Sequence, residues 1–150
     1  MTECYPCAMT ALGENLPPRE RIFAEGGWRV AHAFDSMLPG WLVLVPTRHV
    51  AALDELTVEE AKEFGLLARR ASIALRDVVG CEKTFLMLFA EREGFAHLHV
   101  HVVPRMSDLD PQARGPRVFA LVSADEAAWI PEPERDALAL RLGEAMARCR

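Results

Sequence analysis

The run HLHVHVV, which begins at His97, places a histidine at every second position: His97, His99 and His101. Alternate residues of a β-strand point to the same face, so the run predicts a strand with three imidazoles on one side. The apolar residues between them, Leu98 and Val100, then face a core. Successive imidazoles start roughly 7 Å apart along such a strand. One metal ion with bonds of about 2.1 Å can bind two neighbours but hardly all three, so at least one histidine is left for other chemistry.

A row of imidazoles suits chemistry at phosphorus. With an ordinary pKa of about 6.5, roughly three-quarters of unperturbed imidazoles are neutral near pH 7. A neutral ring can act as a nucleophile without a separate base, and a protonated neighbour can hold or protonate an anionic leaving group. A single histidine on a strand is usually a solvated or hydrogen-bonded side chain. Three in strict alternation opposite an apolar face favour a functional site instead.

Turn and periodicity signals around this run predict an antiparallel sheet. Residues 21–27 and 28–34 form a hairpin that turns at two glycines. Residues 38–46 supply a turn and then a strand buried on both faces, which ends at a proline. Residues 84–90 form another strand, and the short EREG turn after it makes its pairing with the histidine strand antiparallel. The apolar run at 117–123 favours one more strand.

Two helices are expected. Thr57 and Glu60 form a capping-box signature, and apolar residues then recur at three- and four-residue steps up to Gly80, a typical helix stop. A second helix begins near Pro133, with acidic residues in its first turn. The elements predict an α+β fold in which an antiparallel sheet packs with one long central helix and a C-terminal helix. At 150 residues the chain fits a single domain.

The composition narrows the class of partner. The formal net charge is −5, so a nucleic-acid polymer, which requires a basic face, is a poor partner. No apolar run reaches the roughly 18 residues of a membrane helix. The first ten residues lack the charged and apolar regions of a signal peptide. We therefore expect a cytoplasmic protein that binds neither nucleic acid nor membranes.

Cys4 and Cys7 form a close pair in the segment CYPC. Because a disulfide is not expected in the reducing cytoplasm, such a pair suggests a metal site. Redox motifs of this spacing normally lie at a helix start after a strand, whereas this one lies close to the first methionine. A redox pair and two unpaired thiols remain as alternatives. The isolated Cys81 and Cys149 are interpreted as ordinary small residues, and His32 as an ordinary strand or surface residue.

These segments together resemble the histidine triad (HIT) superfamily. HLHVHVV matches the family signature, His-φ-His-φ-His-φ-φ with φ apolar, at every position. LPGWLVLVPTRH resembles the family's glycine-strand-proline-histidine segment, and CYPC resembles the Cys-x-x-Cys of zinc-carrying bacterial and archaeal members. Residues 3–105 follow the family's order of elements. The resemblance implies one HIT-like domain over residues 1–150, with an N-terminal CxxC segment at 1–20 and a divergent C-terminal part at 106–150.

The resemblance also implies an activity. It is that of a nucleotide hydrolase or nucleotidyl transferase acting at the α-phosphorus of a dinucleoside polyphosphate or nucleoside phosphoramidate. His99 would be the nucleophile that carries the nucleotidyl group, and His101 would contact the phosphates and assist the leaving group. The ligands of an implied structural zinc ion would be Cys4, Cys7, His49 and His97. Two thiolates and two imidazoles do form closed tetrahedral sites. Because relatives commonly dimerise through the long helix and the central sheet, a homodimer is expected.

Several positions depart from the family pattern. The Asn and the Gln-Ser or Gln-Thr pair that precede the triad in many members are missing, and Glu93 stands near the Gln position. Asp35 is the nearest match to the acidic residue that binds the ribose hydroxyls, and Trp41 replaces a common histidine. We therefore predict Asp35 and Glu93 as substrate-binding residues. Arg92 or Arg105 is a candidate for positive charge near the phosphates, although solvated surface side chains are the simpler interpretation.

These departures leave two other functions open. One is a nucleotide-binding regulatory protein with little turnover, which the missing phosphate contacts favour. The other is a metal-handling protein that uses the histidine run. Product release and metal stoichiometry distinguish the three functions.

Overall fold

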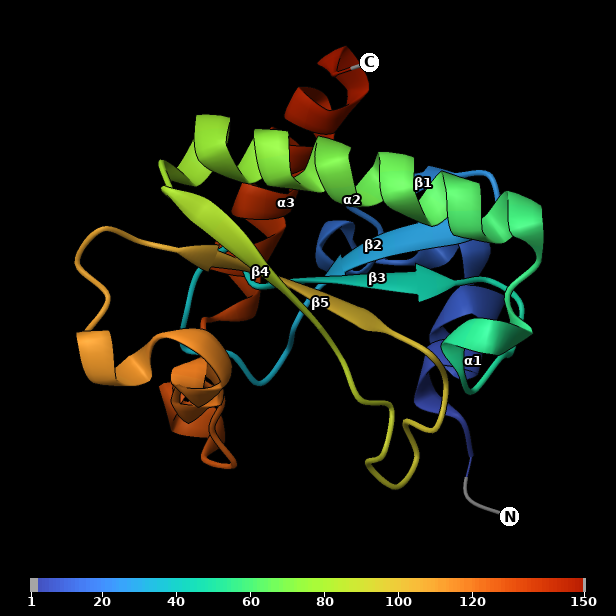
Figure 1. Cartoon of the computed structure of the whole chain (residues 1–150), viewed down its shortest axis with the longest axis horizontal. Helices are drawn as coiled ribbons and strands as arrows, with labels where there is room; N and C mark the ends of the chain where they lie inside the picture. Colours follow the sequence, from blue (N-terminus) through green and yellow to red (C-terminus); the bar gives the residue numbers. More distant parts are fainter. Residues whose placement is uncertain (1–2, 150) are drawn as a thin grey trace.

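The computed structural model describes residues 3–149 as an antiparallel sheet with a long helix across one face (Figure 1). The strand order is β1-β2-β3-β5-β4, and every neighbouring pair is antiparallel. The strands are β1 (Phe23–Glu25), β2 (Trp28–His32), β3 (Leu42–Pro46), β4 (Lys83–Leu88) and β5 (Val100–Arg105). The α-helices are α1 (Tyr5–Ala11), α2 (Val58–Val79) and α3 (Glu132–Arg148). The 3₁₀ helices are η1 (Gly13–Asn15), η2 (Pro18–Glu20), η3 (Leu53–Glu55), η4 (Pro111–Ala113), η5 (Gly115–Leu121) and η6 (Glu126–Ala128). This is the α+β architecture that the sequence predicts.

The strands β1 and β2 form the predicted hairpin. Glu25 pairs with Trp28, so Gly26 and Gly27 make the turn. Gly26 has a φ of +58°, and a Cβ added there would lie 2.5 Å from a carboxylate oxygen of Glu63. A side chain at this position would therefore be both strained and crowded. The same carboxylate accepts a hydrogen bond from the Gly27 N–H at 3.0 Å, which ties the hairpin to α2.

Helix α2 begins at the predicted capping box. The Thr57 hydroxyl accepts from the Glu60 N–H at 3.1 Å, and the Glu60 carboxylate accepts from the Thr57 N–H at 2.8 Å. Gly80 follows the helix with a φ of +73°. The buried residues of α2 are Leu67, Ala68, Ala71, Ala74 and Leu75. They share one core with Leu98 and Val100, so the apolar side of the histidine run faces α2 as predicted.

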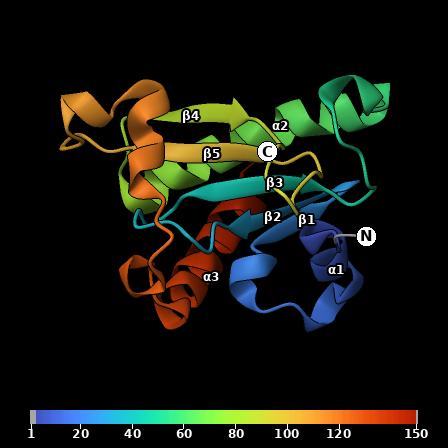
Figure 2. The same ribbon diagram turned by 90° about the horizontal axis from the view of Figure 1, so that it is seen from below.

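The opposite face of the sheet is turned toward the viewer in Figure 2, between α1 and the segment that contains η5. The strand predicted at 117–123 is wrong, because most of this run forms η5. Gly115, with a φ of +65°, and Pro116 favour a helical turn there. The run packs instead on this face of the sheet, where Val118 is buried and Phe119 and Leu121 are half-buried beside it. Phe119 packs against Trp41, with ring centroids 5.4 Å apart.

Helix α3 begins at Glu132, close to the predicted start, and packs against α2, where Arg70 Nη2 donates to the Met146 carbonyl at 2.9 Å. Helix α1 was not predicted from the sequence. Strand β5 starts at Val100, so His97 and His99 lie in the segment just before it. Within residues 3–149, no helix is both long and apolar enough to cross a membrane.

Candidate active site and metal centre

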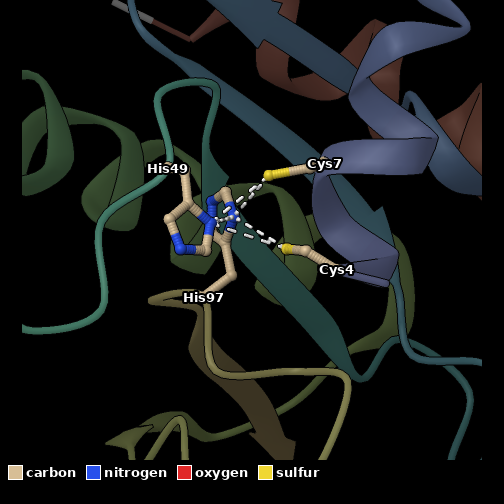
Figure 3. A group of neighbouring side chains, drawn as sticks. All are labelled: Cys4, Cys7, His49 and His97. Atoms are coloured by element: carbon tan, nitrogen blue, oxygen red, sulfur yellow. Dashed lines mark hydrogen bonds between the residues drawn. The ribbon is translucent and has the colours of Figure 1, made fainter. Parts of the chain in front are cut away.

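Four side chains from three separate segments meet beside the start of β5 (Figure 3). Cys4 caps α1, Cys7 lies in its first turn, His49 follows β3 and His97 precedes β5. The sulfur-to-Nδ1 distances are 3.6 and 3.5 Å from Cys4, and 3.3 and 3.4 Å from Cys7, to His49 and His97 respectively. The two Nδ1 atoms are 3.2 Å apart. The structure thus brings together all four residues that the resemblance implied as metal ligands.

These separations fit a tetrahedral ion. With Zn–S bonds near 2.3 Å and Zn–N bonds near 2.0–2.1 Å, the edges of such a tetrahedron are about 3.3–3.8 Å. The measured sulfur–nitrogen and nitrogen–nitrogen edges lie close to this range. The CxxC pair does lie at a helix start, as redox pairs do. A redox pair, however, does not explain why the ring nitrogens of two histidines lie close to both sulfurs. The cluster could hold a metal ion, and its donor set suits zinc.

The second ring nitrogen of His97 supports a ligand role. Nε2 donates to the Pro46 carbonyl at 2.8 Å, because a carbonyl can only accept, and Nδ1 therefore carries a free lone pair. Burial lowers the pKa of His97, which favours the neutral ring that a metal needs. Burial and the neighbouring Cys4 raise the pKa of the Cys7 thiol to about 11. A bound cation would reverse that shift by stabilising the thiolate.

The sheet face away from α2 borders a cavity of about 330 Å³. One row of its floor consists of Ala31, Val43 and His101, which pair across β2, β3 and β5. The next row, by extension of the same register, consists of Arg29, Val45 and His99. The aromatic residues that line the cavity are Tyr5, Phe34, Phe89, Phe95 and Phe119. The small side chains on the floor make room for the cavity, and His99 and His101 lie at one end of it.

The rings of His99 and His101 are neighbours, with centroids 5.2 Å apart. Nδ1 of His99 lies 2.7 Å from the His97 carbonyl oxygen, so Nδ1 must carry the proton and Nε2 has a free lone pair. The indole N–H of Trp41 donates to Nδ1 of His101 at 2.9 Å, which leaves the proton of His101 on Nε2. One ring therefore offers a nucleophilic nitrogen and the next an N–H donor.

His101 is neutral near pH 7. Burial and the nearby His99 lower its pKa to about 4, so it is an N–H donor rather than the protonated neighbour that the sequence suggested. Phe119 of η5 packs edge-on against its ring, with centroids 5.4 Å apart. Sequence reasoning missed the part that Trp41 plays here. The only signal was its place where many family members have a histidine.

The predicted substrate-binding residues differ in their placement. Asp35 lines the cavity and pairs with Arg92, with Oδ2 and Nη1 3.2 Å apart. Arg92 also lines the cavity, whereas Arg105 pairs with Glu82 at 2.9 Å and does not. Glu93 is exposed on the turn and is not among the described residues that line the cavity. The substrate-binding roles of Asp35 and Glu93 stay predictions.

A buried polar group that sequence reasoning missed also lines the cavity; we call it the Glu20 group, formed by Tyr5, Glu20 and Arg29. Glu20 and Arg29 are 7% and 5% exposed. Glu20 accepts from the Tyr5 hydroxyl at 3.2 Å and from Arg29 Nη1 at 3.3 Å. Burial raises the pKa of Tyr5 to about 12, so its hydroxyl keeps the proton. Three distant segments supply these residues, so no local pattern could reveal the group.

His32 is a strand residue, as the sequence predicted, and it is buried. Its Nδ1 donates to the Ala33 carbonyl at 2.8 Å, and its Nε2 accepts from the Gly40 N–H at 2.9 Å. Burial lowers its pKa to about 4. Both ring nitrogens hold the turn after β2, so His32 is structural.

Known proteins resemble this chain over nearly its whole length. An uncharacterized HIT-like protein of Mycobacterium tuberculosis is 24% identical over 147 residues, which cover 95% of this chain and 94% of that protein. A zinc-bound histidine triad family protein from Mycobacterium smegmatis has a TM-score of 0.70 at 19% identity, covering 97% of this chain and 94% of that one. A uridylyltransferase has a TM-score of 0.68 at 19% identity, covering 99% of this chain and 46% of that one.

The pattern of the HIT domain matches residues 17–108, which include the complete triad. This span is more than half of the chain. The chain therefore belongs to the histidine triad (HIT) family.

Proposed function

We propose that this protein hydrolyses or transfers nucleotides at the α-phosphorus, through a covalent nucleotidyl group on Nε2 of His99. One observation carries the proposal: hydrogen bonds with neighbouring groups leave His99 a free Nε2 lone pair beside an Nε2 proton on His101. Membership of the HIT family and the similarity in fold to a uridylyltransferase support a nucleotide substrate. Dinucleoside polyphosphates and nucleoside phosphoramidates are the proposed substrate classes.

The reaction proceeds in two displacements. Nε2 of His99 attacks the α-phosphorus, and the bond from phosphorus to the leaving oxygen or nitrogen breaks with its electron pair going to the leaving group, and a leaving amine takes a proton from the solvent. The His97 carbonyl, which accepts from Nδ1 of His99, stabilises the positive charge that the ring gains. The N–H of His101 donates to a phosphoryl oxygen as charge develops there. Water, or another acceptor hydroxyl, then attacks phosphorus and loses its proton to the solvent. The phosphorus–nitrogen bond breaks with its electron pair returning to Nε2 of His99, which releases the nucleotide.

Two acidic residues complete the proposed substrate contacts. Asp35, held at the cavity by its ion pair with Arg92, accepts from the ribose hydroxyls. Glu93, on the exposed turn, contacts the part of the substrate that extends out of the cavity. Both roles rest on the family resemblance, and the placement of Asp35 supports the first.

We also propose that the ion in the four-residue cluster is a structural zinc. Two thiolates and two imidazoles fill all four positions of a tetrahedral site, so no position is left for substrate. The ion would hold α1, the loop after β3 and the segment before β5 together. His99 and His101 belong to the neighbouring cavity and stay free of it. A reducing compartment such as the cytoplasm would keep both cysteines available as ligands.

The test is nucleotide release by wild type and by His99→Ala, with dinucleoside polyphosphates and nucleoside phosphoramidates as substrates. Loss of the nucleophile should reduce release by roughly a thousandfold or more. Acid quench of the wild type, followed by mass spectrometry, should find a nucleotidyl group on the peptide that contains His99. Glu25→Gln, which changes an exposed side chain outside the cavity, is the control. Undiminished release by His99→Ala would remove His99 from its proposed role.

A second function, regulation by nucleotide binding with little turnover, is favoured by the cavity lining. None of the described residues that line the cavity is Ser, Thr, Asn or Gln. The Ser or Thr hydroxyl and the Asn or Gln amide contacts that many family members make with phosphates therefore have no counterpart in that lining. Tight nucleotide binding without product, at enzyme concentrations above that of the substrate, would select this function.

We further propose a homodimer through α2 and β4. Strand β4 is at the edge of the sheet, with β5 as its only neighbour among the described strands. Leu86 on β4 and Leu66 on α2 are 47% and 67% exposed. An edge strand with apolar side chains pairs readily with a second chain.

A further inference from the structure

The row of the sheet that contains His99 ends in the Glu20 group. Arg29 pairs with Val45, and the β3–β5 register places Val45 beside His99. Two strand spacings, roughly 10 Å in all, therefore separate the backbones of Arg29 and His99. A single nucleoside monophosphate can span this distance. Its phosphorus would lie at His99 and its base toward Arg29.

The cavity between these ends suits a flat ring. Its floor there consists of Val45 and, in the adjacent row, Ala31 and Val43, none of which has a large side chain. Tyr5, Phe34 and Phe95 cluster at its wall, with ring centroids 5.1, 5.7 and 5.9 Å apart. An apolar floor with aromatic walls favours an aromatic base over a sugar or a second phosphate.

The Glu20 group has hydrogen-bonding capacity that the protein does not use. Its Glu20–Arg29 contact is a single one at 3.3 Å, longer than the roughly 2.7–2.9 Å of a strong charge-assisted bond. Nε of Arg29 is buried and has no partner within the described part of the chain. A carboxylate can accept about four hydrogen bonds, and this one accepts two from side chains. Unused donors and acceptors this well buried indicate a polar ligand.

We propose that the Glu20 group selects the nucleobase, and that it favours bases that carry an exocyclic amino group. This inference rests on the proposed function, because the phosphate must lie at His99. The Glu20 carboxylate only accepts hydrogen bonds, so an amino group of guanine, adenine or cytosine matches it. A base carbonyl in the same place would repel it. The free N–H of Arg29 suits the carbonyl or ring nitrogen beside the amino group.

The same residues also have a structural role that must be separated from recognition. Nη1 of Arg29 donates to the Glu20 backbone carbonyl at 2.7 Å, which ties η2 to the sheet. That role alone would make stability depend on these side chains. It would not change the ratio of affinities for two bases. The ratio of the affinities for two bases therefore distinguishes base recognition from a purely structural role.

The experiment measures the binding of GMP, IMP, CMP and UMP to the full-length, metal-loaded protein by calorimetry. GMP and IMP differ only by the amino group at C2, and CMP carries an amino group where UMP has a carbonyl. GMP should bind more tightly than IMP, and CMP more tightly than UMP, by roughly 10- to 100-fold. Glu20→Gln should reduce both ratios to below about threefold. Glu25→Gln, which changes an exposed ion pair outside the cavity, should keep the wild-type ratios.

The outcomes separate this inference from the proposed function. Wild-type ratios near one, with nucleotides bound and cleaved, would overturn base selection and leave the proposed function standing. Ratios that persist in Glu20→Gln would assign the preference to other residues and also contradict the inference. No binding of any nucleotide, together with no nucleotide release, would overturn the proposed function itself. If Glu20→Gln does not fold, Glu20→Asp, which withdraws the carboxylate from the base, replaces it, and both ratios must again fall.

Discussion

Removal of the proposed zinc ion is expected to lower the free energy of unfolding by about 4 kcal/mol. The ion would connect Cys7 to His49, 42 residues away, and His49 to His97, 48 residues further. A permanent cross-link that closes a loop of this length stabilises a fold by about 4 kcal/mol, through the entropy of the unfolded chain. Coordination bonds exchange, so we take one loop rather than two as the estimate. Stability at this level requires free zinc at roughly a thousand times the dissociation constant.

The assay is thermal unfolding with and without chelator, with metal content measured on the same samples. For a chain of 150 residues, 4 kcal/mol corresponds to a fall in Tm of roughly 8–16 °C. Cys7→Ser should reproduce most of this fall without chelator. Cys149→Ser, which changes a cysteine outside the cluster, should leave the chelator effect unchanged.

One result would refute this reasoning. If chelation removes one equivalent of metal and the Tm moves by less than about 1 °C, the ion does not hold the three segments together. The cluster would then be a metal-binding site that does not stabilise the fold. More than one tightly bound zinc per chain would instead favour the metal-handling function.

Three further predictions concern the histidines and the sheet edge. Trp41→Phe removes the N–H that donates to Nδ1 of His101. We expect kcat to fall about tenfold and the free energy of unfolding to fall by about 1–3 kcal/mol. An unchanged kcat would show that Trp41 does not set the tautomer of His101. His32 has a folded pKa of about 4 against an ordinary 6.5, so its contribution is complete above pH 6.5 and is lost as the pH falls toward 4. That loss is about 3 kcal/mol by urea unfolding. Because the pKa of His101 is also lowered to about 4, His32→Gln should remove about half of the combined pH dependence in this window. Leu86→Lys should convert a dimer to a monomer in sedimentation velocity, and a persistent dimer would place the interface elsewhere.

The four-residue cluster shows how much of a site could be predicted from this sequence. The CYPC spacing suggested a metal, but nothing local connects it to His49 or His97, so the complete ligand set came from the family resemblance. The structure places their ligand atoms within 4.8 Å of one another. The same resemblance named Asp35, which lines the cavity, and Glu93, which is exposed and does not.

The sequence by itself determined that His99 and His101 share a face, and where the long helix begins and ends. These are local matters: the period of two in HLHVHVV, the Thr57–Glu60 capping box and the Gly26–Gly27 turn each act within a few residues. The period also separated the histidines from the apolar residues that face α2. The hairpin and the fold class followed from the same short-range signals.

Only the tertiary structure decided what each of these faces meets. Most of the apolar run at 117–123 forms η5, and Phe119 and Val122 of this run line the cavity. The protons of His99 and His101 are placed by the His97 carbonyl and the Trp41 indole. Tyr5, Glu20 and Arg29 come together from α1, η2 and β2. Such contacts depend on how distant segments pack, and the period of a sequence carries information only over a few residues.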